Sequence, residues 1–309
     1  MLDIFDFNSV FDFDIKDHYK HEKQRQIAKN RQDLHNKLFF DLLLDSLHVK
    51  ASDLYPPPSQ RLRDLHQRIT SAKIADHHKQ SLFYYILLDC STPAHEAAED
   101  FAKACHMPHK YYLCMRGLWE MDRKNFRAAL EYLCHPSLQP TFPFTDHILL
   151  ILLRHCSSSE ADLPLAYYHT ASPPLTLTSP ASVLEAYTSY LARDSLTAAL
   201  SFIRQRPRQQ QKLLFELLME EVLANKGELG RELVGLPLTA EEEGWMMEVL
   251  AEEKQDQAAA RGLVVMRKVV TGRVGEVVGD GELRRGFGEV FDGFERGLGP
   301  RMGVGTVEY

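Results

Sequence analysis

The sequence has 309 residues, of which 44% are hydrophobic, which is enough apolar surface for one large or two small folded domains. Its formal net charge of −7 excludes a basic field of the kind that drives non-specific phosphate binding. The five cysteines do not form the even, closely spaced set of a disulfide-stapled secreted domain. The apolar runs are too short for a membrane-spanning helix and the acidic N-terminus is not a secretory signal, so we expect an intracellular, soluble protein.

The first 19 residues combine aromatic and acidic side chains. Phe5, Phe7, Phe11 and Phe13 stand among five aspartates and one lysine. This pattern is typical of segments that dock onto a partner or onto their own domain, and we assign the four phenylalanines as candidate partner-binding residues. The stretch that completes the N-terminal segment, residues 20–37, is polar and net basic, and we interpret it as a solvated helix face.

Helical spacing dominates residues 38–225. Gly117 is the only glycine before residue 227, and glycine costs about 1 kcal/mol per helix position relative to alanine. Leu62, Leu65, His66 and Ile69 follow the i, i+3, i+4, i+7 spacing of one helix face, whereas the alternation typical of strands is absent after residue 20. The sequence therefore predicts an all-α fold.

Prolines mark the expected interruptions of these helices. Three consecutive prolines in residues 53–60 predict a break, because each removes an amide donor. Pro93 and Pro180 each follow a hydroxyl residue and predict helix starts, since proline at the first helical position loses an amide that has no partner there.

Three similar apolar stripes predict a repeated unit. The stripes are centred on Ala129, Ala166 and Ala199, which are 37 and 33 residues apart, close to the roughly 34 residues of tetratricopeptide repeats. A small residue in each stripe would let neighbouring helices approach closely. We predict an irregular α-helical solenoid of two-helix repeats, with a structural core that includes Trp119, Phe126, Ala129, Leu130, Leu196, Ala199 and Leu200.

The chain changes in composition after residue 225, because all glycines except Gly117 lie between residues 227 and 309. In residues 226–270 we expect a helical extension, with Thr239 and Glu242 at capping-box spacing. Trp245 and Met246 in this extension are candidates for a partner groove, with a core role as the alternative. Residues 271–309 have a glycine every few positions and are expected to form a flexible tail.

Two clusters of residues raise the question of chemistry. Cys105, His106, His109 and Cys114 are metal-ligand types, but all lie within ten residues, whereas structural zinc sites tie two distant segments; helix packing and a turn at Pro108 are favoured. No catalytic or phosphate-binding motif occurs, so we expect neither an enzyme nor a cofactor.

The second cluster is "RQRPRQQQK", residues 204–212, which could contact nucleic acid. An AT-type minor-groove hook would carry a glycine where Gln205 stands, so a helix end stopped by Pro207 is the favoured interpretation. Direct DNA binding is not expected.

Several segments resemble, in order and spacing, the ELYS family of nuclear-pore proteins, and in particular its short fungal members. They are "SLFYYILLDC", "HKYYLCMRGLWEMDRKNFRAALEYLCHPSLQPTF", "DHILLILLRH" and "YLARDSLTAALSFIRQR". The resemblance runs from about Leu38 to Arg206. It rests on Gly117, Trp119, Asp122, Phe126, Ala129, Leu130, Pro136 and Ser137.

The resemblance implies a helical domain attached to the long arm of the Y-shaped outer-ring complex, at the nuclear pore in the nuclear envelope. Its expected partners are long-arm nucleoporins, namely a β-propeller/helical nucleoporin and a neighbouring WD-repeat nucleoporin. The β-propeller and AT-hooks of animal members have no counterpart in this sequence, so chromatin targeting is not implied. An alternative function is a tetratricopeptide-like adaptor that binds short peptide motifs.

Overall fold

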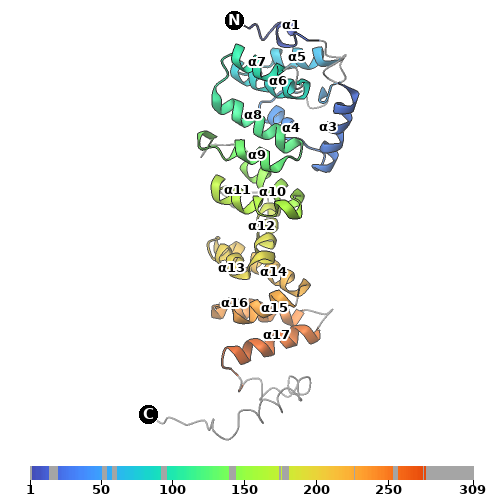
Figure 1. Ribbon diagram of the computed structural model, residues 1–309. Coiled ribbons are helices and arrows are strands. Elements are labelled where there is room, and N and C mark those ends of the chain that lie inside the picture. Colours follow the sequence, from blue (N-terminus) through green and yellow to red (C-terminus); the bar gives the residue numbers. More distant parts are fainter. Residues whose placement is uncertain are drawn as a thin grey trace. The chain divides into compact units, whose positions relative to one another are not determined.

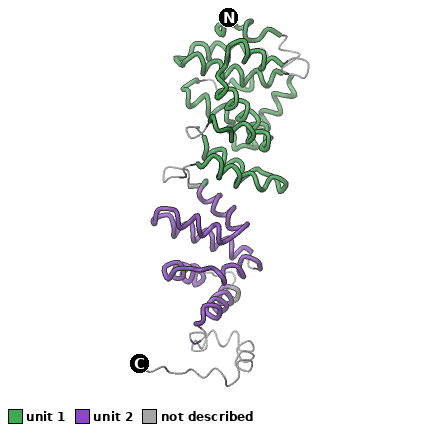
Figure 2. Tube along the Cα trace, turned by 60° about the vertical axis from the view of Figure 1, so that its left-hand side comes forward, with its two compact units in different colours: residues 1–183 green, residues 184–309 purple. Residues whose placement is uncertain are grey.

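The computed structural model describes residues 2–13, 20–50, 54–57, 61–91, 96–138, 144–173, 175, 181–225, 227–252, 257–273 and 275. These residues form α-helices and short 3₁₀ turns, and no strand occurs among them, so the predicted all-α class is confirmed (Figure 1). None of the described helices combines the length and apolar character needed to cross a bilayer. The chain divides into two compact units, Met1–Val183 and Leu184–Tyr309 (Figure 2).

Unit 1 is built from short helices. In chain order they are α1 (Phe7–Val10), α3 (His21–Asp33), α4 (Phe39–Ser46), α5 (Leu62–Ser71), α6 (Asp76–Cys90), α7 (Ala97–Ala104), α8 (His109–Asp122), α9 (Phe126–Leu133), η3 (Pro136–Leu138), α10 (Thr145–His155), η4 (Ser158–Glu160) and α11 (Leu163–Ala171). Helix α12 (Ala181–Asp194) begins in unit 1 and continues into unit 2.

Helices α6 and α8 form the centre of unit 1. Every residue from Ser81 to Cys90 is buried, which is the property of a helix that is covered on all sides. Helix α6 packs against α5, α7 and α8, and α8 packs in turn against α3, α4 and α9. The apolar run "LFYYILL" is therefore the inner helix of this unit rather than one face of an amphipathic helix.

The pair α8 and α9 explains the isolated glycine of the body. A β-carbon at Gly117 would lie 2.5 Å from Leu133 Cγ and 2.6 Å from its Cδ2, inside van der Waals contact. Only glycine allows α9 to approach α8 this closely at that point. The stripe that faces this contact includes Phe126, Ala129 and Leu130, all buried.

The third expected stripe differs from the other two. Leu163 and Tyr167 of α11 are buried, but Ala166 is exposed, so it is not a close-packing alanine like Ala129 and Ala199. Ala166 is therefore not structurally equivalent to Ala129 and Ala199, and the intervals of 37 and 33 residues do not measure the length of a repeat. Consecutive helices do pack in pairs, α8 with α9 and α10 with α11, while the solenoid arrangement stays a prediction.

Several expected interruptions can be compared with the structure. Residues 54–57 lie outside any α-helix, as the proline-rich break predicts. Pro93 and Pro180 lie outside the described residues, and the described helices that follow them begin at Ala97 and Ala181. Pro108 does stand at a helix junction, directly before α8.

Unit 2 continues with α13 (Leu196–Arg204), α14 (Arg208–Ala224), α15 (Glu228–Gly235), α16 (Ala240–Glu252) and α17 (Gln257–Val270). Its core contains Leu196, Ala199 and Leu200 of the predicted stripe; α13 packs against α14, and α14 also packs against α16. The capping box of α16 is formed: the Glu242 amide donates to Thr239 Oγ1 at 3.3 Å, and the Thr239 amide donates to Glu242 Oε2 at 2.7 Å. Most of the expected Gly-rich tail, from residue 276, lies outside the described residues.

Candidate partner-binding site

The N-terminal aromatic segment docks onto its own unit. Asp6 caps α1, and this turn places Phe7 and Phe11 on the ring of His66, with ring centroids 5.5 and 6.3 Å apart. His66 in turn stacks on Phe83 of α6 at 4.9 Å. Both phenylalanines are buried, so they are not exposed to a partner, and docking onto their own domain is what these two residues do.

The other two phenylalanines of this segment are more accessible. Phe5 is 55% exposed and lies under the ammonium group of Lys79 at 4.9 Å from the ring centroid. Phe13 is half-buried and contacts Phe11 edge to face at 6.3 Å. Of the four candidates, Phe5 alone presents most of its ring to solvent.

The two candidates in unit 2 lie in different environments. Met246 is buried, which corrects its assignment to a partner groove and supports the alternative core role. Trp245 is half-buried, and its ring meets that of Phe215 edge to face at 5.8 Å. The Trp–Met pair therefore does not form an exposed apolar face.

A buried polar network holds the centre of unit 1, and Asp122 is its main acceptor. Its carboxylate accepts hydrogen bonds from the amides of Phe39 and Phe40, at 2.8 and 3.1 Å, and from the Tyr85 hydroxyl at 2.5 Å. The two amides belong to the first turn of α4, where they have no partner within the helix. Burial raises the pKa of Asp122 to about 7, although these three hydrogen bonds act in the opposite direction.

Asp89 is the second buried acceptor of the network. It accepts hydrogen bonds from the Tyr55 hydroxyl at 2.5 Å and from Trp119 Nε1 at 2.8 Å. Burial raises the pKa of Asp89 as well. Trp119, which we expected in the core, is half-buried: its nitrogen points to Asp89, while the Arg123 guanidinium lies over the ring at 4.4 Å.

Helix α3 is attached to this network by polar side chains. Buried Asn30 donates to the carbonyl oxygen of Asp122 at 2.9 Å, and Lys23 donates to that of Asp89 at 2.6 Å. Arg31 pairs with Asp41 of α4 through two hydrogen bonds of 3.0 and 2.8 Å. One side of the polar stretch 20–37 is therefore a docking face, which composition alone did not reveal.

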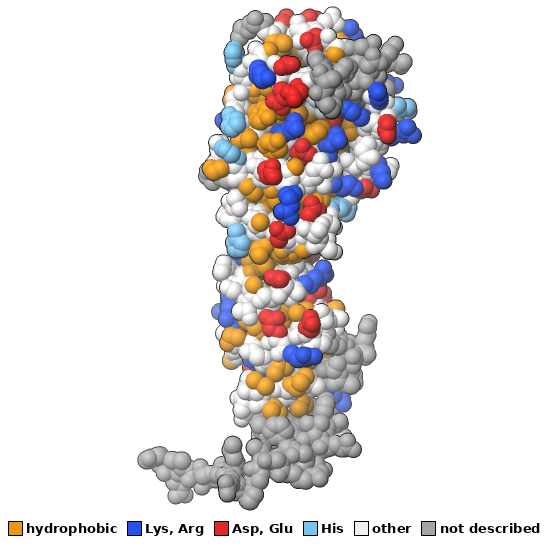
Figure 3. Space-filling model, in the orientation of Figure 1, with side chains coloured by type: hydrophobic (Ala, Val, Ile, Leu, Met, Phe, Trp, Pro, Cys, Tyr) orange, Lys and Arg blue, Asp and Glu red, His pale blue; other side chains and the backbone are white. Residues whose placement is uncertain are grey.

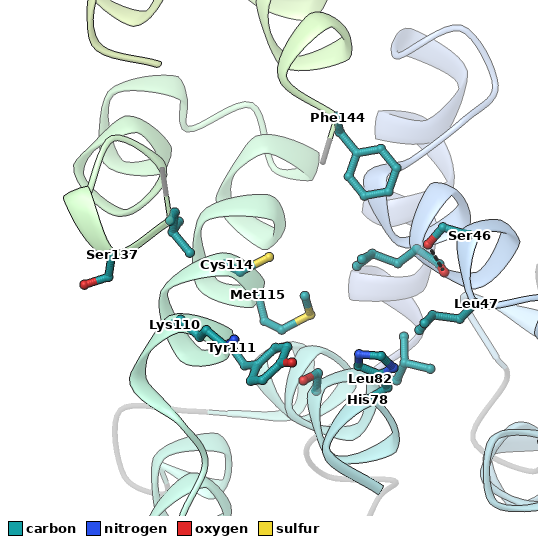
Figure 4. A pocket seen from close by; sticks show the side chains of 13 residues that line it. Ser46, Leu47, His78, Leu82, Lys110, Tyr111, Cys114, Met115, Ser137 and Phe144 are labelled. Carbon is teal, nitrogen blue, oxygen red and sulfur yellow. Dashed lines mark hydrogen bonds between the residues drawn. The ribbon is translucent and has the colours of Figure 1, made fainter. Parts of the chain in front are cut away.

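An apolar groove opens between α4 and α8, with α6 as its floor (Figure 4). It encloses a cavity of about 250 Å³. Tyr111, Cys114 and Met115 line one side of it in Figure 4 and Leu47 the other. The remaining lining residues are Leu43, Ser46, His78, Ser81, Leu82, Lys110, Ser137, Leu138 and Phe144.

The polar groups of the groove are few. Ser46 and Ser81 donate their hydroxyl protons to the carbonyl oxygens of Leu43 and His77, at 2.9 and 2.7 Å. Burial, and then the nearby charge of His77, lower the pKa of His78, which favours a neutral imidazole at pH 7. Lys110 is the one charged side chain among the described lining residues.

The candidate metal ligands do not come together. Among the residues that the structure describes, which include Cys105, His106, His109 and Cys114, no three His, Cys, Asp or Glu side chains are grouped for a metal ion. His106 stands in the turn after α7 with a positive φ of 50°, and Cys114 faces the apolar groove.

The basic stretch 204–212 is a junction between two helices, as favoured. Helix α13 ends at Arg204, and Pro207 directly precedes α14. Arg204 pairs with Glu242 at 2.7 Å and Arg208 with Glu241 at 2.9 Å, both carboxylates on α16. Lys212 pairs with Glu248 of the same helix at 2.8 Å. Because these cations are neutralised within unit 2, the stretch is not a free basic patch.

Comparison with known proteins identifies the helical body. A family model described as ELYS, nuclear pore complex assembly, matches residues 37–253, which is more than two thirds of the chain. The chain belongs to the ELYS family. The ELYS match starts just before α4 and ends after α16. It therefore extends beyond Arg206, the end of the resemblance seen in the sequence, and includes most helices of unit 2.

A curated relative comes from Schizosaccharomyces pombe (strain 972), the uncharacterized protein ely5. It is 27% identical to this ELYS chain over 230 residues, which cover 73% of the chain and 72% of the relative. Membership of the ELYS family assigns the protein to nuclear pore complex assembly and to the nuclear pore complex at the nuclear envelope. This family is not known as an enzyme family.

Proposed function

We propose that this ELYS protein is a structural nucleoporin, a helical scaffold or adaptor subunit attached to the long arm of the Y-shaped outer-ring complex. Its partners there would be the β-propeller/helical nucleoporin and the neighbouring WD-repeat nucleoporin. In this position it would support pore assembly and, through it, the transport of proteins and mRNA. The observation that carries the proposal is the family match over residues 37–253.

The surface of the described helices is compatible with such a role. On the face drawn in Figure 3, basic and acidic side chains are interspersed among apolar ones, and neither charge forms a large continuous field. Arg204, Arg208 and Lys212 of the 204–212 stretch are paired with carboxylates of the same unit, which argues against a DNA contact through these three residues. These features support recognition by folded proteins.

Size-exclusion chromatography tests the proposal. The purified full chain is mixed with the purified long-arm nucleoporins of the same organism at physiological salt. A scaffold subunit is expected to co-elute with them at fixed stoichiometry, because stable complexes of this kind bury upwards of about 1,200 Å². Separate elution at micromolar concentrations would contradict the proposal.

The groove between α4 and α8 favours a second candidate, a tetratricopeptide-like adaptor that binds short peptides reversibly. Such an adaptor is expected to bind isolated linear peptides with micromolar affinity that falls with salt. A scaffold subunit would need the folded long-arm proteins instead. Titrating the chain with overlapping peptides from the long-arm nucleoporins, beside the intact proteins, separates these two functions.

A further inference from the structure

Lys110 stands at the mouth of the apolar groove of unit 1, at the second residue of α8. We propose that this groove receives an amphipathic helix of a folded partner, which inserts apolar side chains between α4 and α8 and places a carboxylate opposite Lys110. The inference rests on the proposed function, because it takes the partner from the nucleoporins of the long arm.

The volume of the groove suits side chains of a partner protein better than a bound cofactor. Its cavity of about 250 Å³ is below the 300–1,000 Å³ that is typical of pockets for drug-sized ligands. Among its lining residues, Leu43, Leu82 and Met115 are buried, while Leu47 and Tyr111 are half-buried. A space of this size and lining suits a few apolar side chains of another protein.

The charge of the groove selects an acidic partner. No Asp or Glu occurs among its described lining residues. Lys110 is exposed and forms no ion pair with any described residue; its ammonium group lies only over the Tyr111 ring, at 5.0 Å from the centroid. The Tyr111 hydroxyl likewise has no hydrogen-bond partner in the described part of the chain. Both groups are therefore available as donors to a carboxylate of a partner.

The partner segment is inferred to be helical because the apolar groove cannot supply hydrogen bonds to the backbone of an extended peptide. An extended peptide would bring unpaired amides and carbonyls into an apolar space, where each costs free energy unless it is paired. The Ser46 and Ser81 protons are already donated within the unit. A helix satisfies its own backbone, and helices commonly place apolar faces into grooves between other helices.

The test compares three variants of the full chain in binding to the purified long-arm nucleoporins. Lys110→Glu reverses the charge at the mouth of the groove, and Leu47→Glu places a charge on its apolar side. Lys29→Glu is the matched control, because Lys29 is an exposed lysine on α3 of the same unit and does not line the groove. Circular dichroism and thermal melting check that all three are folded. We expect both groove variants to raise Kd at least tenfold, with the control unchanged.

Cross-linking gives a second readout on the intact complex. A photoreactive benzoylphenylalanine at position 47 is expected to link to a helical segment of a long-arm nucleoporin that carries Asp or Glu beside apolar residues. A link to residues of this chain itself would overturn the inference, since the groove would then be filled from within.

The outcomes separate the inference from the proposed function. If the natural chain binds and both groove variants bind equally well, the groove inference is wrong and the scaffold function stands. If the natural chain itself does not bind the long-arm nucleoporins, both are overturned. Reduced binding of Lys110→Glu and Leu47→Glu, with normal binding of Lys29→Glu, supports both.

Discussion

A methyl group at position 117 has no room in unit 1, because its carbon would lie 2.5 Å from Leu133 Cγ. We predict that Gly117→Ala destabilises the unit by about 1–3 kcal/mol, the usual cost of overpacking a core. The better helix propensity of alanine, about 1 kcal/mol, offsets only part of this. Urea unfolding followed by circular dichroism measures the change.

Gly244 provides the matched control for this substitution. It lies within α16, is exposed, and a β-carbon there would meet nothing within 4 Å. Gly244→Ala is therefore expected to be neutral or to stabilise by up to about 1 kcal/mol. Equal effects of the two substitutions would mean that Leu133 moves aside at little cost.

Asp122 makes a pH-dependent contribution to the stability of unit 1. Its pKa is about 7 in the folded protein, against the 3.8 of an ordinary aspartate side chain in water. Between these two values the folded state holds a proton that the unfolded state has released, so this residue makes the free energy of unfolding fall as pH rises from about 4 to about 7. Through Asp122, the free energy of unfolding falls by at most about 1.4 kcal/mol per pH unit in this range.

The variant Asp122→Asn tests this contribution, because asparagine does not titrate. Urea unfolding at about pH 5, 6 and 7 is expected to show a steeper decline for the natural chain than for the variant, which keeps the contribution of Asp89 but not that of Asp122. Parallel pH profiles would mean that the carboxylate stays ionised when folded, its three hydrogen bonds outweighing burial.

At the scale of residues, the sequence indicates which positions are unusual but not what they contact. A single glycine in a long helical body signals a close approach, yet its neighbour Leu133 follows only from the packing of α8 and α9. Asp89 ends the apolar run "FYYILL", and an acid in that place could have been recognised as a buried acceptor. Its partners Tyr55 and Trp119 lie 34 and 30 residues away, and no local pattern connects them.

At the scale of elements, the attachment of α1 depends on Phe7 rather than on Phe5. Phe7→Ala is expected to cost up to about 3 kcal/mol, the low end for a buried phenylalanine, because a terminal segment can undock without unfolding the rest. Phe5→Ala, at a side chain that is 55% exposed, is expected to change stability by less than about 1 kcal/mol. Thermal melting of both variants measures the two losses of stability. A larger loss for Phe5→Ala would mean that Phe5 rather than Phe7 attaches α1.

The link between α13 and α16 provides a second comparison of paired variants. Glu242 is buried and accepts two hydrogen bonds from Arg204, whereas the pair of Arg208 and Glu241 is exposed. Arg204→Ala is expected to cost about 1–3 kcal/mol, since it leaves a buried carboxylate without its cation, a loss moderated by the partial exposure of Arg204. Arg208→Ala is expected to cost under about 1 kcal/mol in urea unfolding. Equal losses would contradict a special role for Glu242.

Helix periodicity predicts elements well where one face is apolar and less well where contacts are polar. The stripes of α9 and α13 are buried as their spacing predicts. Helix α3 has no apolar stripe and docks through Asn30, Lys23 and Arg31, which a hydrophobic pattern cannot detect. Ala166 shows the opposite error, because it fits the spacing of a stripe and is nevertheless exposed.

At the scale of the whole molecule, contacts and composition divide the chain at different places. The units separate between Val183 and Leu184, inside α12, whereas glycine becomes frequent only after residue 226. A rise in glycine content shows where the helix propensity of the chain falls, whereas the contacts between helices show which of them share a core. The family match, residues 37–253, includes helices of both units, so the ELYS region is not the same as either unit.

Since each unit has its own core, destabilisation is expected to stay within the unit that is changed. Hydrogen exchange resolved by peptide, under native conditions, measures this for the Gly117→Ala and Arg204→Ala variants. Gly117→Ala is expected to speed exchange in α3 to α10 and leave α13 to α16 unchanged, and Arg204→Ala should do the reverse. Helix α12 begins in one unit and continues into the other, so it should respond to both. Uniform acceleration of all helices by either variant would instead mean that the chain unfolds as one cooperative body.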